Sequence, residues 1–267
     1  MELGIFFDHL VEAARQKNLP LQRVLEHASA HNIRYVDIDG AFLMQNEHRV
    51  EDMLQKTGLY VGCVDGRFDL AHDQGMDEAE ALIRFAAQRD IRHVLLIPGY
   101  AQPGEERGEI MERIAEHLRP LAHVAAGFHV QCSLEDYDDN RAPYGTWQEL
   151  CWFLKRVEGL GVTFDTGNFA YFGQDAREAL TQLLPFVRMA HCKDRARRSV
   201  AGEAGVQTPG GELLYPCAVG EGMIPIAELL KMLAKGGYHG GLTIEHFDSN
   251  RQYEAMAASA DWLSMNI

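Results

Sequence analysis

Long apolar runs and a targeting segment are both missing from this sequence. No stretch reaches the roughly 20 consecutive apolar residues that a membrane-spanning helix requires. Residues 1–16 contain no basic segment followed by an apolar run, so we expect no signal peptide. These absences predict a cytoplasmic protein without a membrane partner.

Cysteine is scarce, and none of the cysteines forms a Cys-x-x-Cys pair. The chain has five cysteines among 267 residues, at positions 63, 132, 151, 192 and 217. An odd and dispersed set predicts reduced thiols in a reducing compartment, and it argues against a disulfide framework.

Positive charge is also in short supply. The chain carries 25 lysines and arginines against 39 acidic residues, for a formal net charge of −14. A surface this acidic repels a phosphate backbone, so we expect no nucleic-acid partner. No Gly-x-Gly-x-x-Gly follows the first predicted strand, and no Gly-x₄-Gly-Lys-Ser/Thr motif occurs, so the usual nucleotide-binding markers are absent.

The sequence does contain a regular alternation of short apolar runs and longer segments with helical periodicity. Eight such units of roughly 30 residues each are typical of a (β/α)₈ barrel, which we predict as a single domain over residues 1–267. A doubly wound α/β sheet is the alternative fold. We expect a long loop at about 193–223, because this stretch is rich in Gly, Arg and Pro. The predicted strands span residues 3–7, 34–38, 59–64, 92–97, 128–134, 162–164, 187–190 and 241–244.

Chemically active side chains follow the last four predicted strands. They are Glu135, Asp165, His191 and Glu245. Because a barrel gathers the carboxyl ends of its strands at one mouth, we expect these side chains to converge. Carboxylates this close repel by about 4 kcal/mol per pair at an effective dielectric constant near 20, so either some are protonated or a cation lies among them. Three oxygen ligands and one nitrogen favour one divalent ion, Mn²⁺ or Mg²⁺, with Co²⁺ and Zn²⁺ as alternatives.

Each of these positions also has a purely structural interpretation. Asp165 could cap its own turn, Glu135 could belong to a solvated acidic loop, and His191 could be a core histidine. His9, Asp39 and Asp65 follow the first three predicted strands and could line the same mouth. An Asp-Gly pair is equally a turn signal.

Five motifs resemble the xylose-isomerase-like barrel superfamily of sugar phosphate isomerases and epimerases. They are SLEDYDD, TFDTGN, AHCKD, AVGEGMIP and LTIEH, and the resemblance extends over essentially the whole chain. It implies a divalent metal held by Glu135, Asp165, His191 and Glu245, with the two glutamates also acting as the acid/base pair. It further implies a substrate-binding arginine near Arg197, and a loop carboxylate, Glu221, folding over the mouth.

Two positions refine this resemblance. Some relatives carry a histidine three residues after the aspartate, where this chain has Asn168. An amide is a poor metal ligand but can bind a sugar hydroxyl, which argues against a multi-metal endonuclease. Lys193 alternates with His191 along the strand end and could face the site. The basic cluster Arg195, Arg197 and Arg198 could bind a substrate phosphate or carboxylate, or could be a solvated loop.

We therefore predict a metal-dependent sugar or sugar-phosphate isomerase/epimerase that transfers protons through an enediolate. Expected substrate-binding residues are Asn168, Lys193, Arg197, Glu221 and His9. The alternative is a dehydratase (lyase) acting on a polyol or keto-sugar acid at the same metal site. An endonuclease-like phosphodiester hydrolase and a non-catalytic sugar-binding barrel are weaker hypotheses. The expected partner is a small sugar or sugar phosphate, and the sequence is compatible with a homo-oligomer.

Overall fold

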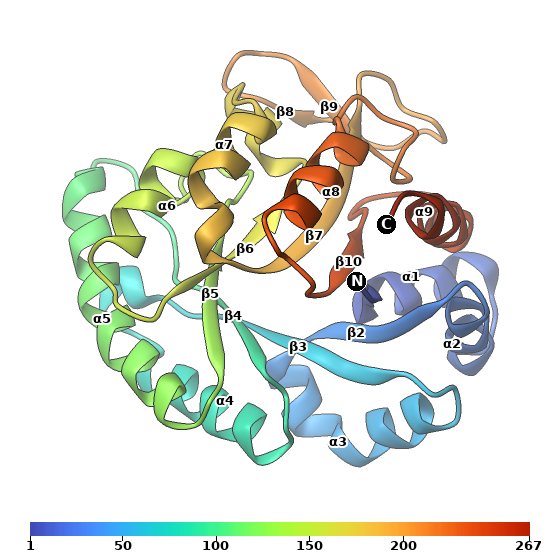
Figure 1. Ribbon diagram of the computed structural model, residues 1–267, viewed down its shortest axis with the longest axis horizontal. Coiled ribbons are helices and arrows are strands. Elements are labelled where there is room, and N and C mark those ends of the chain that lie inside the picture. Colours follow the sequence, from blue (N-terminus) through green and yellow to red (C-terminus); the bar gives the residue numbers. More distant parts are fainter.

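The computed structural model describes residues 1–267 and shows eight parallel strands closed into a barrel (Figure 1). Strands β1 to β7 pair in chain order, and β10 closes the barrel by pairing with both β7 and β1. The predicted (β/α)₈ barrel, a single domain, is therefore confirmed. The barrel strands are β1 (Leu3–Phe6), β2 (Ile33–Asp39), β3 (Tyr60–Arg67), β4 (His93–Ile97), β5 (Gln131–Glu135), β6 (Gly161–Asp165), β7 (Val187–Ala196) and β10 (Leu242–Glu245).

Nine helices surround the barrel (Figure 1). Their buried faces repeat every three or four residues and cover the outside of the sheet, so each strand is enclosed on both sides. None of the helices is both long and apolar enough to span a membrane. The helices are α1 (Phe7–Lys17), α2 (Leu21–Ala30), α3 (Gly40–Gln55), α4 (Met76–Gln88), α5 (Arg107–Gly127), α6 (Trp147–Leu154), α7 (Ala176–Leu183), α8 (Ile226–Lys235) and α9 (Gln252–Asn266).

Helix α1 was not predicted from the sequence. It starts at Phe7, immediately after β1, and buries Phe7, Leu10 and Ala14 at helical spacing. The predicted strand 3–7 was therefore too long by its last residue, and Asp8 and His9 belong to a helix. This placement decides where the side chain of His9 points.

The segment 193–223 contains more regular structure than a loop. Strand β7 continues to Ala196, and β9 (Leu213–Cys217) pairs with its outer end in antiparallel fashion. A short strand β8 (Val206–Gln207) pairs with β9 to form a hairpin. Figure 1 shows this hairpin projecting beyond the ring of barrel strands. The hairpin brings Val206 to the cavity described below.

Tyr35 fills the amino-terminal part of the barrel interior. Its ring is buried, and a β-carbon built at Gly4, Gly62 or Gly241 would overlap it. These three glycines lie on or beside strands β1, β3 and β10, so the absence of their side chains makes the room that the ring occupies. We call them the glycine collar. The collar holds the Tyr35 hydroxyl 3.0 Å from Thr243 Oγ1, deep inside the barrel.

Gly4→Ala is expected to destabilise the fold by about 1–3 kcal/mol, because the added methyl must displace the Tyr35 ring from a close-packed core. The matched control is Gly108→Ala in α5, where a β-carbon meets nothing within 4 Å and alanine favours the helix. Urea denaturation measures both free energies of unfolding. Equal stabilities of the two variants would contradict the role of the collar.

Candidate metal centre

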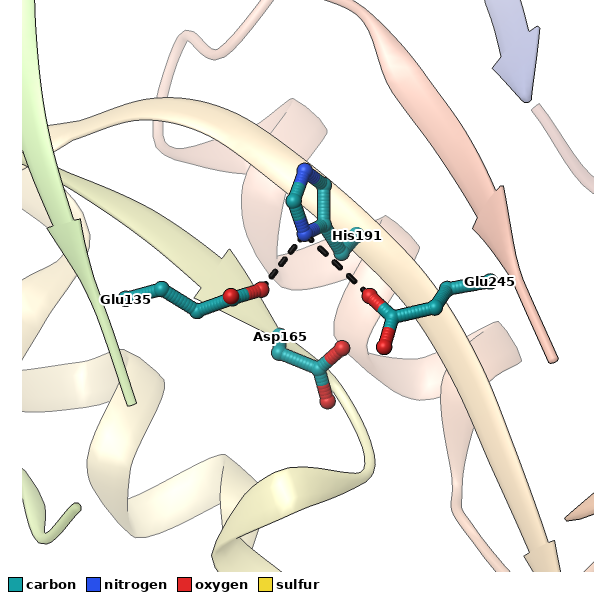
Figure 2. Close-up of side chains that lie close together, drawn as sticks. All are labelled: Glu135, Asp165, His191 and Glu245. Atoms are coloured by element: carbon teal, nitrogen blue, oxygen red, sulfur yellow. Dashed lines mark hydrogen bonds and ion pairs between the residues drawn. The ribbon is translucent and has the colours of Figure 1, made fainter. Parts of the chain in front are cut away.

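Four buried side chains meet at the carboxyl-terminal mouth of the barrel. Glu135, Asp165 and Glu245 are the last residues of β5, β6 and β10, and His191 lies within β7. One ligand atom from each lies within 4.8 Å of all the others. Parallel register brings them together, since Asp165 pairs with His191, and His191 with Thr243 of β10. Figure 2 shows the three carboxylates and the imidazole turned toward a common centre.

The contacts within this tetrad leave one oxygen without a partner. His191 Nδ1 lies 2.5 Å from Glu135 Oε1 and 3.3 Å from Glu245 Oε2 (Figure 2). Asp165 Oδ1 accepts hydrogen bonds from the backbone amides of Gly167 and Asn168, at 2.7 and 2.6 Å. Its other oxygen, Oδ2, is buried and has no hydrogen-bond partner. Leaving a buried carboxylate oxygen unpaired is costly, so this atom indicates a position for a ligand.

The electrostatics of the tetrad are those of a site short of positive charge. Burial raises the pKa of Glu135, and raises that of Asp165 well above its ordinary value. Burial opposes ionisation of Glu245 too, but the Lys193 ammonium and His191 hold the pKa of Glu245 well below its usual range. Three oxygen donors and one nitrogen donor around an unpaired oxygen fit a metal ion, which would replace protons as the counter-charge.

A chain of buried hydrogen bonds joins Tyr35, Thr243 and Asp37, and Asp37 lies beside His191. Asp37 Oδ2 lies 3.4 Å from His191 Nε2 and accepts a hydrogen bond of 2.7 Å from Thr243 Oγ1. With its own proton donated to Asp37, Thr243 Oγ1 accepts from the Tyr35 hydroxyl. Partners of this kind fix the orientation of a metal-binding imidazole. Sequence reasoning missed Asp37 because it lies inside a strand, although two aspartates separated by one residue in VDID point to the same side.

A cavity of about 310 Å³ opens above the tetrad. Glu135 and Glu245 line it, whereas Asp165 and His191 lie behind them. A volume at the small end of the range for ligand sites fits a monosaccharide-sized molecule. The remaining polar lining comprises Asp8, Asp37, Asp39, Asp65, Arg67, Tyr137, Asp138, Asn168, Lys193, Arg195 and Asp248.

Asn168 and Lys193 reach this cavity together. Lys193 Nζ lies 2.5 Å from Glu245 Oε1 and donates a hydrogen bond of 2.7 Å to Asn168 Oδ1. The Asn168 side-chain amide in turn donates to the backbone carbonyl of Asp136 at 2.8 Å. Both side chains are thereby fixed at the edge of the tetrad.

Three residues expected to bind substrate lie outside the cavity. His9 is in α1, where its Nε2 accepts from the His246 amide at 3.0 Å, and its ring stacks on His246. Arg197 follows the end of β7 and is exposed, 3.1 Å from Glu212. Glu221 lies 3.3 Å from Arg251. The position of Glu221 is set by the buried carboxylate of Asp194, which accepts hydrogen bonds from the backbone amides of residues 220, 222 and 224 and so holds that loop in place.

Arg195, and not Arg197, is the arginine of the basic cluster that lines the cavity. It is buried in the cavity wall and pairs with Asp138. Continuation of β7 to Ala196 explains the difference, because residues 191, 193 and 195 then point to the same side of the strand.

A family model described as "Xylose isomerase-like TIM barrel" matches residues 25–265. The chain belongs to this family. A relative from Rhizobium meliloti, "Rhizopine catabolism protein MocC", is 26% identical over 256 residues, which cover 85% of this chain and 74% of the relative.

Solved structures with different chemistries share the fold. A D-psicose 3-epimerase with D-tagatose, from Clostridium cellulolyticum H10, superposes with a TM-score of 0.75 at 16% identity, covering 100% of this chain and 99% of that one. The probable 3-DHS dehydratase AsbF from Bacillus anthracis gives 0.73 at 14%, covering 99% of each. The IOLI protein with a bound zinc atom gives 0.75 at 17%, covering 100% and 99%. At these identities the likeness is one of fold.

Removing divalent ions with a chelator should lower the melting temperature, and added Mn²⁺ should restore it. An ion that binds only the folded chain stabilises it by about 3 kcal/mol at roughly 100 times its Kd. Asp165→Asn keeps an oxygen for the two backbone amides but removes a charge, so the Mn²⁺ affinity should fall at least about tenfold.

The control for this measurement is Asp138→Asn, a carboxylate of the same cavity that lies outside the tetrad. Its Mn²⁺ affinity should stay within about threefold of the parent value, since it offers no ligand. Calorimetric titration of the ion-free protein gives the affinities. Equal losses in the two variants would show that the tetrad is not the binding site.

Proposed function

We propose that this chain is a divalent-metal-dependent isomerase or epimerase of a small sugar or polyol ketone, with proton transfer through an enediolate. Glu135, Asp165, His191 and Glu245 would hold one ion, Mn²⁺ or Mg²⁺ in preference to Co²⁺ or Zn²⁺, since three of the four donors are carboxylates. The observation that carries the proposal is that only the two glutamates of the tetrad line the cavity. Those side chains can reach both the ion and a substrate.

The two glutamates divide the proton transfer between them. A carbon next to a carbonyl loses its proton to a carboxylate base, and return of a proton from another carboxylate inverts that carbon. A bound divalent ion polarises the carbonyl and neutralises the charge that develops on its oxygen. Glu245 begins as the base, because Lys193 Nζ lies 2.5 Å from its Oε1 and keeps it ionised. Glu135, whose pKa burial raises, then delivers its own proton from its side of the cavity.

We assign substrate binding to side chains of the cavity whose positions are already fixed by hydrogen bonds. Asn168 and Lys193 are fixed beside Glu245 and can donate hydrogen bonds to sugar hydroxyls. The similar epimerase structure contains D-tagatose, which supports a ketose-sized ligand. The tetrad side chains are buried, so their charges act in a region of low dielectric constant, where electrostatic interactions are stronger than in water.

Glu245→Gln is expected to lower kcat by about 10²–10⁴-fold, because the amide cannot accept the substrate proton. The matched control is Glu116→Gln on the exposed side of α5, which should leave kcat unchanged. Activity on a panel of ketoses is measured by chromatography, with and without chelator, and circular dichroism checks the fold. Turnover that survives complete metal removal, or parent-like turnover of Glu245→Gln, would contradict the proposal.

Dehydration is the second candidate, and the position of Lys193 favours it. Elimination of water requires an acid for the departing hydroxyl, and this ammonium group lines the cavity beside Glu245. The similar structure of a probable dehydratase supports the same chemistry.

Mass spectrometry of the product separates the two reactions. We expect an isomer of unchanged mass, and Lys193→Met should then retain measurable proton exchange at the carbon next to the carbonyl. A product lighter by one water, together with loss of about 10²–10⁴-fold of its formation in Lys193→Met, would instead assign the protein as a dehydratase.

A further inference from the structure

One side of the cavity carries four carboxylates that the proposed reaction does not use. Asp8 begins α1, Asp37 and Asp39 lie in β2, and Asp65 lies in β3. All four line the cavity, at β1 to β3, which lie across the barrel from β5 and β6 and next to β10. We call this group the acidic wall.

Asp37 gives independent evidence that the acidic wall faces a ligand. Its side chain is 1% exposed and lines the cavity. Oδ2 is engaged by Thr243, but Oδ1 is buried without any hydrogen-bond partner. A buried carboxylate oxygen that no protein group satisfies requires a donor from outside the chain.

Positive charge does not balance the acidic wall. Arg67 is the only cationic side chain of the cavity on that side, it is more than half exposed, and its closest approach to Asp65 is 3.9 Å. Burial raises the pKa of Asp65 to about 7, against the effect of Arg67 and with a further contribution from Asp39, Asp37 and Asp8. Within the wall, Asp65 is paired only with Arg67 and Asp37 lies 3.4 Å from the His191 imidazole, whereas Asp8 and Asp39 form no ion pair.

The cations on the other side of the cavity are already paired. Lys193 lies against Glu245, and Arg195 pairs with Asp138. Arg197, which could have bound a phosphate, is outside the cavity. Eight carboxylates and three cationic side chains line the cavity, so it stays negative even after a divalent ion binds. An anionic substrate such as a sugar phosphate would be repelled.

We propose that the acidic wall recognises a protonated amino group, and that the substrate is an amino sugar or a related aminopolyol. An ammonium group supplies both the positive charge that the wall lacks and a hydrogen-bond donor for Asp37 Oδ1. The substrate's carbonyl end then lies toward Glu135 and Glu245, with its amino group at β1 to β3, across the cavity from Glu135. This inference rests on the proposed function and narrows its substrate class.

Binding of matched amine and hydroxyl compounds tests the inference. The probes are D-glucosamine with D-glucose, D-mannosamine with D-mannose, and an aminocyclitol with its parent cyclitol, titrated at pH 7 into the Mn²⁺-loaded protein. In at least one pair the amine should bind about tenfold more tightly or better, which corresponds to about 1.4 kcal/mol. Asp65→Asn and Asp8→Asn should each weaken that amine at least about fivefold and leave its hydroxyl partner within about twofold.

Asp90→Asn is the control, because Asp90 is exposed and lies just before β4, at the opposite end of the barrel. It should change neither affinity. Failure of every amine to bind more tightly than its partner overturns the inference, as does tighter binding of D-glucosamine 6-phosphate than of D-glucosamine. Metal analysis should find one ion per chain, and a second ion that Asp65→Asn removes would assign the wall to a metal instead.

These binding measurements do not depend on turnover. An amine preference in a protein that never isomerises a substrate would refute the proposed function and retain the acidic wall. Isomerisation of neutral ketoses without any amine preference would support the proposed function and refute the recognition of an amino group by the acidic wall.

Discussion

The mutual repulsion of three buried carboxylates is the constraint on which the site depends. Neighbouring strands lie about 4.8 Å apart, and the closed barrel keeps side chains at their ends from moving away from one another. Glu135, Asp165 and Glu245 are held within 4.8 Å of one another and of His191 by this geometry. Such a cluster is stable only when protons or a cation offset the charge, and the buried, unpaired oxygen on Asp165 marks where a cation would bind.

The barrel interior links this cluster to the fold. Glycines at the amino-terminal end admit the Tyr35 ring, and Tyr35, Thr243 and Asp37 form a hydrogen-bonded line that ends 3.4 Å from His191 Nε2. This line fixes the Asp37 carboxylate beside the imidazole, while Asp37 Oδ1 and His191 Nε2 have no hydrogen-bond partner of their own. The free oxygen of Asp37 belongs to the acidic wall, and Asp37 connects the tetrad to the side of the cavity where we propose that an amino group binds.

The sequence was informative where parallel register fixes the geometry. Strand ends could be read from apolar runs, and a closed barrel then brings Glu135, Asp165, His191 and Glu245 together. Two of the residues predicted to bind substrate lie outside the cavity: His9, because a helix with few sequence signals starts directly after β1, and Glu221, because Asp194 fixes its loop through distant backbone contacts. Asp37 was missed because a strand-internal aspartate is visible only once the strand's inward face is known. The sequence does not show which side chains face one another across the cavity, because that arrangement arises only when the barrel closes.

A crystal structure of the protein grown with Mn²⁺, with data collected at the manganese absorption edge, tests the central claim most directly. The account predicts one anomalous peak per chain, within coordination distance of Glu135, Asp165, His191 and Glu245, at about 2.0–2.3 Å as expected for hard-cation ligands. No peak at the tetrad, or a peak held instead by Asp37, Asp39 and Asp65, would contradict it.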